Sequence, residues 1–405
     1  MKILDKASAT DAAPRVFVFL GHGFGASWAR GELPGINEVM PYGYHHGRDE
    51  GCIVTYSEDT PEGPVRRLVR LGLRKTLGFD MIHAWRNRDG LRDAHVIWTH
   101  TELESLAALA FLLTRRGETR PRVIAQSIWL FGRWQELSKP KHWLYQRLLQ
   151  RADILTVQCE ANRTAARRLF PAAHVQVVPF GIDIGKVVPV NPRPAHHPFR
   201  ILALGRDMHR DWATLIAAVG NLPEFEVRIG ARKIDRSLAA KGGNIRLVKP
   251  SSEEVAELYQ WADLVVISLK PNIHISGITV LTEAALFGVP VVCTDTGGLQ
   301  EYFDDKCVKY VPVGDPEAMR RAINELAADD RRRFDLASNA QAHLIESDLS
   351  TRARARKLAG LTHALLANGV NGSFGEDRPA NSPLPASVET FGRASSGGPT
   401  TGDPS

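Results

Sequence analysis

Cysteine is scarce in this chain of 405 residues, and its four copies are scattered. They lie far apart in the sequence, at Cys52, Cys159, Cys293 and Cys307. This spacing matches neither the paired ligands of a zinc site nor the framework of a small disulfide-bonded domain. Unpaired thiols are typical of a reducing compartment, so we expect a cytoplasmic protein.

Long apolar runs are also missing. None approaches the roughly eighteen residues that a membrane-spanning helix needs, and the segment 16–20 is too short for the core of a signal peptide. Charge of one sign is not dominant either, since 51 basic residues face 45 acidic ones. The formal net charge of +6 favours an anionic partner, such as a nucleotide diphosphate or an anionic lipid. The arginines belong to no recognisable nucleic-acid-binding fold, so we expect no nucleic acid partner.

What the chain does contain is a twofold alternation of strands and helices. Its hydrophobic content of 43% and charged content of 24% are those of a globular protein, and its length suits two domains. Alternating strands and helices predict parallel sheets with crossover helices, that is, an α/β protein with two Rossmann-like domains. We expect a loose leader at 1–13, a first domain at 14–183, a proline-rich linker at 184–198, a second domain at 199–345, a helix within 346–368 and a disordered tail at 369–405.

The stretch from His274 to Gly298 has the most informative local pattern. Ser276 and Gly277 suit the start of a helix over about 278–287, with the serine hydroxyl accepting from free backbone N–H groups. A buried strand follows at 291–293. The N–H groups at such a helix start favour an anion, and the same helix presents the carboxylate of Glu283 to a sugar hydroxyl.

Two arginines lie in another loop of the same predicted domain. Arg206 and Arg210 fall between a strand at 199–204 and a helix at 211–219, at the sheet edge where open α/β sheets bind ligands. A guanidinium can hold a phosphate through two hydrogen bonds. Lys233, after the next strand, is a third candidate cation. A solvated cluster of charges is the alternative interpretation of all three.

These motifs resemble the nucleotide-sugar site of GT-B glycosyltransferases, especially family 4 and its relatives in bacterial polysaccharide assembly. Such enzymes carry Glu-x7-Glu, then Ala, Gly, Pro-Val-Val and Thr/Ser-Asp-x-Gly-Gly. Glu283 matches the second glutamate, which holds the ribose in the family. Arg206 matches a family arginine on the donor diphosphate, and Arg210 stands near the place of a family lysine. Position 275, where the first glutamate falls, is Ile275, and this departure leaves the stereochemical outcome open.

The resemblance implies a GT-B fold whose two domains face an interdomain cleft, with the final helix packing back on the first domain. It also implies transfer of a sugar from a nucleotide diphosphate sugar, UDP- or GDP-linked, to an acceptor hydroxyl in polysaccharide or glycolipid assembly. No further cofactor and no metal is implied. The expected donor-binding residues are Arg206, Arg210, Lys233, His274, Ser276, Gly277, Ile278, Thr279 and Glu283.

The first domain offers weaker signals. Gly21 to Ala26 follows the first strand and fits the dinucleotide fingerprint Gly-x-Gly-x-x-Gly/Ala, which supports an alternative function as a dinucleotide-dependent oxidoreductase. The acidic residue that this fingerprint requires about 20 positions later is not placed as expected. We therefore favour Gly21 and Gly23 as a loop that lets the backbone approach the donor phosphate or the acceptor. A nucleotide-sugar 2-epimerase of the same fold is a further alternative.

His100 and Glu102 are the candidate catalytic residues, since they follow a strand at the presumed cleft and either could exchange a proton. The alternative is a helix start, with Thr101 capping and Glu104 on the helix dipole. His45, His46 and Asp49 lie in an early loop, but their spacing matches no standard metal-ligand set.

Residues 64–77 are basic on one helical face and aliphatic on the other. Such a helix can lie on an anionic membrane surface, and Lys139, Lys141 and Trp143 extend the basic patch. The alternative is a surface helix whose apolar face packs on the core. Because relatives in polysaccharide assembly often use lipid-linked acceptors, we expect peripheral contact with the inner face of the membrane.

Overall fold

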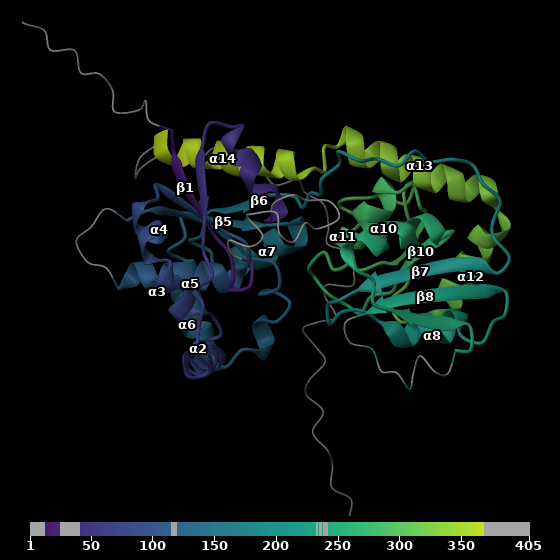
Figure 1. The fold of residues 1–405 in the computed structure, drawn as a ribbon, viewed down its shortest axis with the longest axis horizontal. Coiled ribbons are helices and arrows are strands. Elements are labelled where there is room, and N and C mark those ends of the chain that lie inside the picture. The colour runs from purple at the N-terminus through teal and green to yellow at the C-terminus, as the bar shows by residue number, and fades with distance from the viewer. Residues whose placement is uncertain are drawn as a thin grey trace, which may run out of the picture. The chain divides into compact units, whose positions relative to one another are not determined.

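A computed structural model of the chain describes residues 13–24, 41–114, 120–231, 234, 237 and 242–367. Within them, two parallel sheets of six strands each are built from consecutive parts of the chain (Figure 1). The predicted fold class is confirmed. The expected leader (apart from Ala13) and tail, and the candidates Lys233 and Ala26, lie outside the described residues.

The first sheet has the strand order β2-β1-β3-β4-β5-β6. Its strands are β1 (Arg15–Phe19), β2 (Ile53–Tyr56), β3 (Val96–Thr99), β4 (Arg122–Gln126), β5 (Ile154–Val157) and β6 (Val175–Val177). The helices of this part of the chain are η1 (Pro41–Arg48), α2 (Pro64–Leu77), α3 (Met81–Arg86), α4 (Arg88–Asp93), α5 (Glu102–Leu113), η2 (Trp134–Glu136), α6 (Lys139–Leu149) and α7 (Glu160–Leu169).

The second sheet has the order β12-β11-β10-β7-β8-β9. Its strands are β7 (Phe199–Gly205), β8 (Phe225–Ala231), β9 (Ile245–Val248), β10 (Leu264–Ile267), β11 (Val291–Thr294) and β12 (Lys309–Val311). Its helices are α8 (Trp212–Val219), α10 (Ser252–Trp261), α11 (Ile278–Leu286), α12 (Pro316–Ala328) and α13 (Asp330–Glu346).

The strand order of each sheet reverses at one place. In the second sheet β7 lies between β8 and β10, and in the first β1 lies between β2 and β3. Loops that leave the carboxyl ends of strands at such a place diverge and open a crevice. The loops after β7 and β10 carry the 206–210 and 274–277 segments, and the loop after β3 carries His100. The topology therefore accounts for the position of most sequence-predicted site residues.

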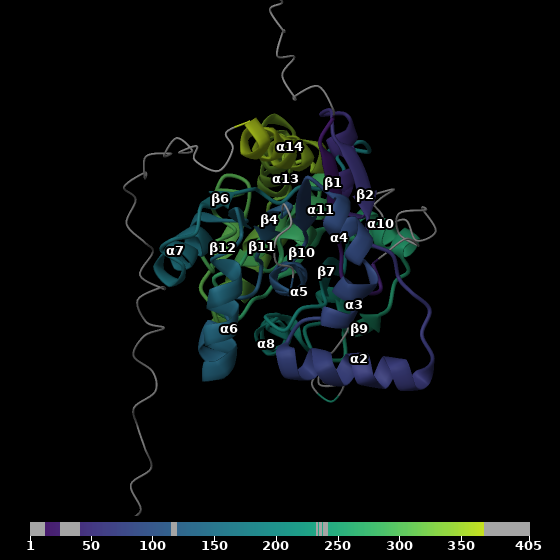
Figure 2. The ribbon, with the colours of Figure 1, turned by 90° about the vertical axis from the view of Figure 1, so that its left-hand side faces the viewer.

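The last described helix, α14 (Thr351–Ala367), packs on the first sheet and on η1 (Figures 1 and 2). The buried indole of Trp98 on β3 donates from Nε1 to Oγ1 of Thr362 over 2.9 Å. Near the start of the helix, Gly43 lies so close to Thr351 that a Cβ at position 43 would overlap its side chain. The end of the described chain thus completes the core of the first domain.

Helix α2 spans the 64–77 segment, but it does not bury its apolar face. Val65 is 75% exposed and Leu68 is 73% exposed. Arg70 is instead buried, and its guanidinium lies 2.7 Å from Glu62 and 2.6 Å from Asp80. The alternative of an apolar face packed on the core is therefore wrong, because ion pairs hold the opposite face inward. Figure 2 shows α2 at the edge of the protein, beside α3.

No described helix is both long and apolar enough to cross a membrane.

Candidate functional site

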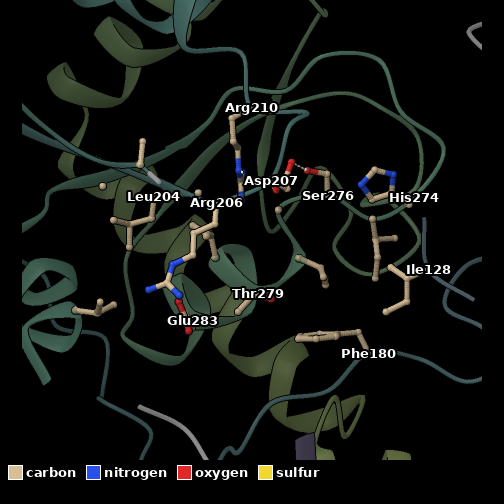
Figure 3. A pocket seen from close by; sticks show the side chains of 18 of the residues that line it. Ile128, Phe180, Leu204, Arg206, Asp207, Arg210, His274, Ser276, Thr279 and Glu283 are labelled. Atoms are coloured by element: carbon tan, nitrogen blue, oxygen red, sulfur yellow. Dashed lines mark hydrogen bonds and ion pairs between the residues drawn. The ribbon is translucent and has the colours of Figure 1, made fainter. Parts of the chain in front are cut away.

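A cleft of about 910 Å³ lies between the loops of the two sheets. Its lining from the first sheet includes Tyr42, His100, Trp129 and Phe180. From the second sheet it takes every described residue of the predicted donor set, namely Arg206, Arg210, His274, Ser276, Gly277, Ile278, Thr279 and Glu283. Figure 3 shows Arg206 and Glu283 on one side of this cavity and Ile128 and Phe180 on another.

Arg210 is the most unusual cation of the cleft, because it is only 6% exposed. Asp207 forms an ion pair with it at 3.3 Å from Nε. Among the described residues, neither Nε nor Nη1 finds a hydrogen-bond partner. Burial lowers the pKa of this guanidinium from its ordinary value, since desolvation disfavours the charged form. Buried donors that lack partners are rare in proteins, so this group is arranged to receive an acceptor.

Two glycines make room for the Arg210 side chain. A Cβ at Gly205 would overlap it, and a Cβ at Gly277 would lie 3.2 Å from its Nη1. Gly277 also has φ +93°, a left-handed conformation that favours glycine. The glycines of both loops therefore fix where the guanidinium lies.

The start of α11 differs from its prediction. Its N-cap is Gly277, and no side chain caps it. The expected cap by the Ser276 hydroxyl is wrong, because Oγ donates to Oδ1 of Asp207 over 2.9 Å, as Figure 3 shows. The Ile278 N–H donates to the carbonyl of Ile275 over 3.1 Å. At a helix start the next N–H groups, here those of Thr279 and Val280, have no partner within the helix.

Glu283 lies one and a half turns into α11 and is half-buried. Its carboxylate accepts from the Tyr259 hydroxyl over 2.7 Å. Burial raises the pKa of Glu283 to about 7, although the hydrogen bond from Tyr259 and the charge of Arg206 both lower it. Figure 3 shows the Arg206 side chain extending toward Glu283. A carboxyl group in this setting can be ionised by a ligand that donates hydrogen bonds to it.

His274 is 3% exposed, and within the described residues neither of its ring nitrogens has a hydrogen-bond partner. Its ring meets that of His209 edge to face at 4.5 Å between centroids. Burial, and next the neighbouring His209, lower the pKa of His274 to about 4. The imidazole is therefore neutral near pH 7 and offers one donor and one acceptor to the cleft.

The two candidate catalytic residues occupy different places. His100 lines the cleft, and its Nδ1 lies 3.1 Å from the Tyr44 hydroxyl. Glu102 is not among the described lining residues; its buried carboxylate accepts from the N–H groups of Ile128 and Trp129, over 3.0 and 3.3 Å. This contact holds the loop that brings Trp129 to the cleft. The alternative of a helix start is confirmed beside it, since Thr101 and Glu104 form a capping box.

Gly21 and Gly23 are likewise outside the described lining of the cleft. The N–H of Gly23 donates to both oxygens of Asp59, over 3.1 and 3.0 Å. A Cβ at Gly21 would lie 2.6 Å from Oε1 of Glu104, so this glycine is needed for close packing on α5.

No cluster of three or more metal-binding side chains occurs in the described ranges. His46 instead lies 3.3 Å from Asp49, which also pairs with Arg352 of α14.

The lining residues that were not predicted from the sequence include Tyr42, Trp129, Phe180 and Asp207. Asp207 has a detectable signal, since it lies between the two arginines in a strand-to-helix loop. The others come from loops whose approach to the cleft depends on how the two sheets pack.

Residues 199–329 match the family model described as glycosyl transferases group 1. The D-inositol 3-phosphate glycosyltransferase of Corynebacterium urealyticum is 26% identical over 311 residues, which are 66% of this chain and 68% of the relative. The two matches support a glycosyltransferase of the GT-B, family 4-like type. Sugar transfer from a nucleotide sugar is therefore its function, and no finding supports the epimerase or oxidoreductase alternatives.

Solved structures place the glycosyltransferase in the same fold. The sucrose-phosphate synthase of Thermosynechococcus elongatus has a TM-score of 0.69 at 18% identity and covers 88% of this chain and 100% of that one. Anabaena Alr3699/HepE, crystallised with UDP and glucose, has a TM-score of 0.64 at 15% identity and covers 86% and 99%. At these identities the likeness concerns the fold.

Proposed function

We propose that the donor of this glycosyltransferase is a uridine diphosphate sugar held by the second domain. The diphosphate would lie between Arg206, Arg210 and the open N–H groups at the start of α11, and Glu283 would bind the ribose hydroxyls. The structural neighbour crystallised with UDP and glucose supports uridine over guanosine. The choice of base follows from that likeness, whereas the choice of phosphate contacts follows from this chain's own cations.

One observation carries the proposal: the guanidinium of Arg210 is buried beside an uncapped helix start, and its Nε and Nη1 lack hydrogen-bond partners among the described residues. Negative charge grows on the leaving diphosphate as the sugar departs. Donors that are already aimed at that charge, in a site with little water, stabilise the transition state without reorganisation. His274 is neutral at pH 7 and would add a hydrogen bond without adding charge.

Calorimetric titration with UDP and GDP tests the donor site. We expect UDP to bind and Arg210→Gln to weaken UDP by about 10- to 100-fold, as for a lost charge-assisted contact to phosphate. The matched control is Arg193→Gln, an arginine whose side-chain contacts lie at Gln260, Ala262 and Asp263. The proposal is wrong if both variants bind UDP equally, and a preference for GDP would overturn the choice of base.

The acceptor would meet the first-domain wall of the cleft, where His100 supplies a polar contact and Trp129 and Phe180 supply aromatic surface. A hydroxyl of a saccharide or of a lipid-linked sugar fits this lining. The relatives named for D-inositol 3-phosphate support a hydroxylated acceptor. Because Glu102 anchors the Trp129 loop, we assign it a positioning role and keep His100 as the residue that meets substrate.

We further propose that α2 brings the enzyme to the inner face of an anionic membrane. Val65, Leu68, Val69 and Leu73 recur at helical spacing and are exposed. Exposed cations flank this stripe at Arg66 and Lys75, and Trp143 of the adjoining α6 is 63% exposed. An apolar stripe between cations is the pattern of a helix that lies in the interface of a bilayer. The ion pairs of Arg70 support this orientation.

Co-sedimentation with lipid vesicles tests the membrane contact. We expect binding to vesicles that contain anionic lipid and weak binding to neutral ones, because cations near an anionic surface contribute about 1 kcal/mol each. Leu68→Ser with Val69→Ser should abolish binding without lowering stability. Ile345→Ser, at another exposed apolar position, on α13, is the control. Unchanged binding of the double variant would contradict the proposal.

A further inference from the structure

A buried arginine of the last helix reaches the cleft histidine through one tyrosine. Arg354 of α14 is 5% exposed, and its guanidinium carbon lies 4.6 Å from the centroid of the Tyr44 ring. Its Nη2 donates to the Tyr44 hydroxyl over 2.8 Å and to Oε1 of Gln126 over 2.6 Å. The same hydroxyl lies 3.1 Å from Nδ1 of His100. A continuous path thus joins the end of the described chain to the cleft.

Arg354 forms no ion pair with any acidic side chain of the described ranges; its described partners are a ring, a hydroxyl, an amide and a carbonyl. A buried charge that is not neutralised polarises the groups around it strongly, because the local dielectric constant is low. The hydroxyl and imidazole beside Arg354 therefore feel a fixed positive charge on the side away from the cleft.

The position of the His100 ring is also fixed. Tyr42 stacks on it at 3.6 Å between centroids, with φ +55°, which is uncommon for a residue other than glycine. The carbonyl of Tyr42 accepts from Nη1 of Arg354 over 3.3 Å, so the same arginine supports this backbone. With one ring face covered and Nδ1 at Tyr44, the edge that carries Nε2 is left to face the cleft.

The hydroxyl proton of Tyr44 decides which nitrogen of His100 carries a proton. Arginine can only donate, so the hydroxyl oxygen accepts from Arg354. Among the described acceptors, its proton can point to Nδ1 of His100 at 3.1 Å or to the carbonyl of Thr99 at 3.4 Å, and the shorter contact is the better hydrogen bond. Electrostatics agrees, because the lone pair on Nδ1 is the negative end of the ring and faces the cation.

We propose that Arg354 and Tyr44 are positioning residues that hold His100 as the neutral Nε2–H tautomer, so that it donates a hydrogen bond to a substrate oxygen instead of accepting a proton. This inference rests on the proposed function only in naming a sugar oxygen as the partner. In this proposal α14 sets the direction of the hydrogen bond that His100 forms with substrate.

Nitrogen NMR of protein with ¹⁵N-labelled histidine tests the tautomer directly and needs no turnover. The spectrum contains its own reference, because Nε2 of His83 lies 3.0 Å from the carbonyl of Leu20, which can only accept. We expect His100, assigned by its loss in His100→Gln, to show the His83 pattern in the parent protein. In Tyr44→Phe, His100 should change toward the other tautomer while His83 stays. A proton on Nδ1 in the parent protein would overturn the inference, whether or not the variant folds.

Assays of sugar transfer distinguish a hydrogen-bond donor from a general base at position 100. The amide of His100→Gln can still donate from the position of Nε2, so we expect it to keep transfer within about 10-fold, while His100→Ala loses on the order of 100-fold, as when a preorganised donor is removed. UDP affinity should stay the same in both variants, because the UDP contacts lie in the second domain. Equal losses for Gln and Ala would contradict the donor role. Absence of transfer with the expected NMR pattern would refute the proposed function but not the tautomer.

Discussion

Glu283 shows how burial prepares a single residue for its ligand. Its pKa of about 7 means that the carboxyl group is half protonated near neutral pH, although Tyr259 donates to it. Ribose hydroxyls that donate to the carboxylate favour its ionised form. In the proposed donor site, binding of a nucleoside and ionisation of this residue are therefore coupled.

We predict that UDP affinity rises with pH by up to about 10-fold between pH 6 and pH 8, since the ionised fraction of a group with a pKa near 7 rises by that factor. Calorimetry in matched buffers measures it. Glu283→Gln should lose this part of the pH dependence and keep the part that comes from the phosphates of UDP. Parallel pH profiles for the parent protein and the variant would contradict the assignment of Glu283.

The raised pKa of Glu283 also leads to a prediction about the free energy of unfolding of the ligand-free protein. The native carboxyl group binds its proton up to about pH 7, whereas an unfolded glutamate releases it near pH 4.5. The native state thus holds more protons between these values, and its free energy of unfolding falls as pH rises through this window. Thermal denaturation of Glu283→Gln should show a smaller fall from pH 5 to pH 8 than the parent protein. An equal fall would show that Glu283 is already ionised in the native state.

At the scale of elements, a buried hydrogen bond between Trp98 and Thr362 joins helix α14 to the first sheet. Thr362→Val keeps the volume of the side chain but leaves the Trp98 N–H without its partner, so we predict a loss of about 1–3 kcal/mol in the free energy of unfolding. Chemical denaturation measures this loss. In a Trp98→Phe background the same substitution should cost much less, because the N–H is already gone. Equal costs in both backgrounds would contradict this role of the hydrogen bond.

Strands and the helices beside the cleft were predictable from sequence because their signals are local. Residues 278–286 of α11 carry an apolar helical pattern that ends before a glycine and a proline, and 64–77 was bounded by its own periodicity. Helices α3, α4 and α7 were not predicted from the sequence, and their lengths are 6, 6 and 10 residues. Helix α13 was not predicted either, because its apolar face of Leu336, Ala340 and Leu344 is sparse and lies among many charged residues.

Local sequence patterns did not predict those parts of the site whose geometry depends on packing between helices, strands and loops. Arg206, Arg210 and Glu283 were found because each lies in a strand-to-helix unit with its own signal. The inward direction of Arg70 depends on Glu62 and Asp80, and no periodicity of α2 alone reveals it. Tyr42 reaches His100 only because η1 packs on α14, more than 300 residues later in the chain.

At the scale of the whole described fold, contacts between the two sheets' loops set the geometry of the cleft. The Tyr302 hydroxyl donates to the carbonyl of Gln158 over 2.6 Å and accepts from the N–H of Phe180 over 2.9 Å. The carboxylate of Glu301 accepts from the N–H groups of Glu160 and Ala161 at the start of α7. Because Gln158 and Phe180 line the cleft, these contacts connect the second domain to the first-domain wall of the cleft.

Tyr302→Phe should therefore affect transfer more than donor binding. The variant leaves a buried carbonyl and a buried N–H without their partner, which costs about 1–3 kcal/mol of stability and lets the two walls of the cleft separate. We predict a fall in kcat for transfer of about 10-fold, since small misplacements of reacting groups are costly, with UDP affinity unchanged because the predicted UDP contacts lie in the second domain. Steady-state kinetics and calorimetry measure the two effects.

Tyr310→Phe is the matched control, because the Tyr310 hydroxyl donates to the carbonyl of Phe303 over 2.7 Å within the second domain alone. It should lower stability by a similar amount without changing kcat at temperatures where the protein stays folded. If the two variants lowered kcat equally, the effect would be a general loss of stability. If Tyr302→Phe weakened UDP as much as it slowed transfer, the donor site would extend across both domains, and the division of work between them argued from the lining residues would be wrong.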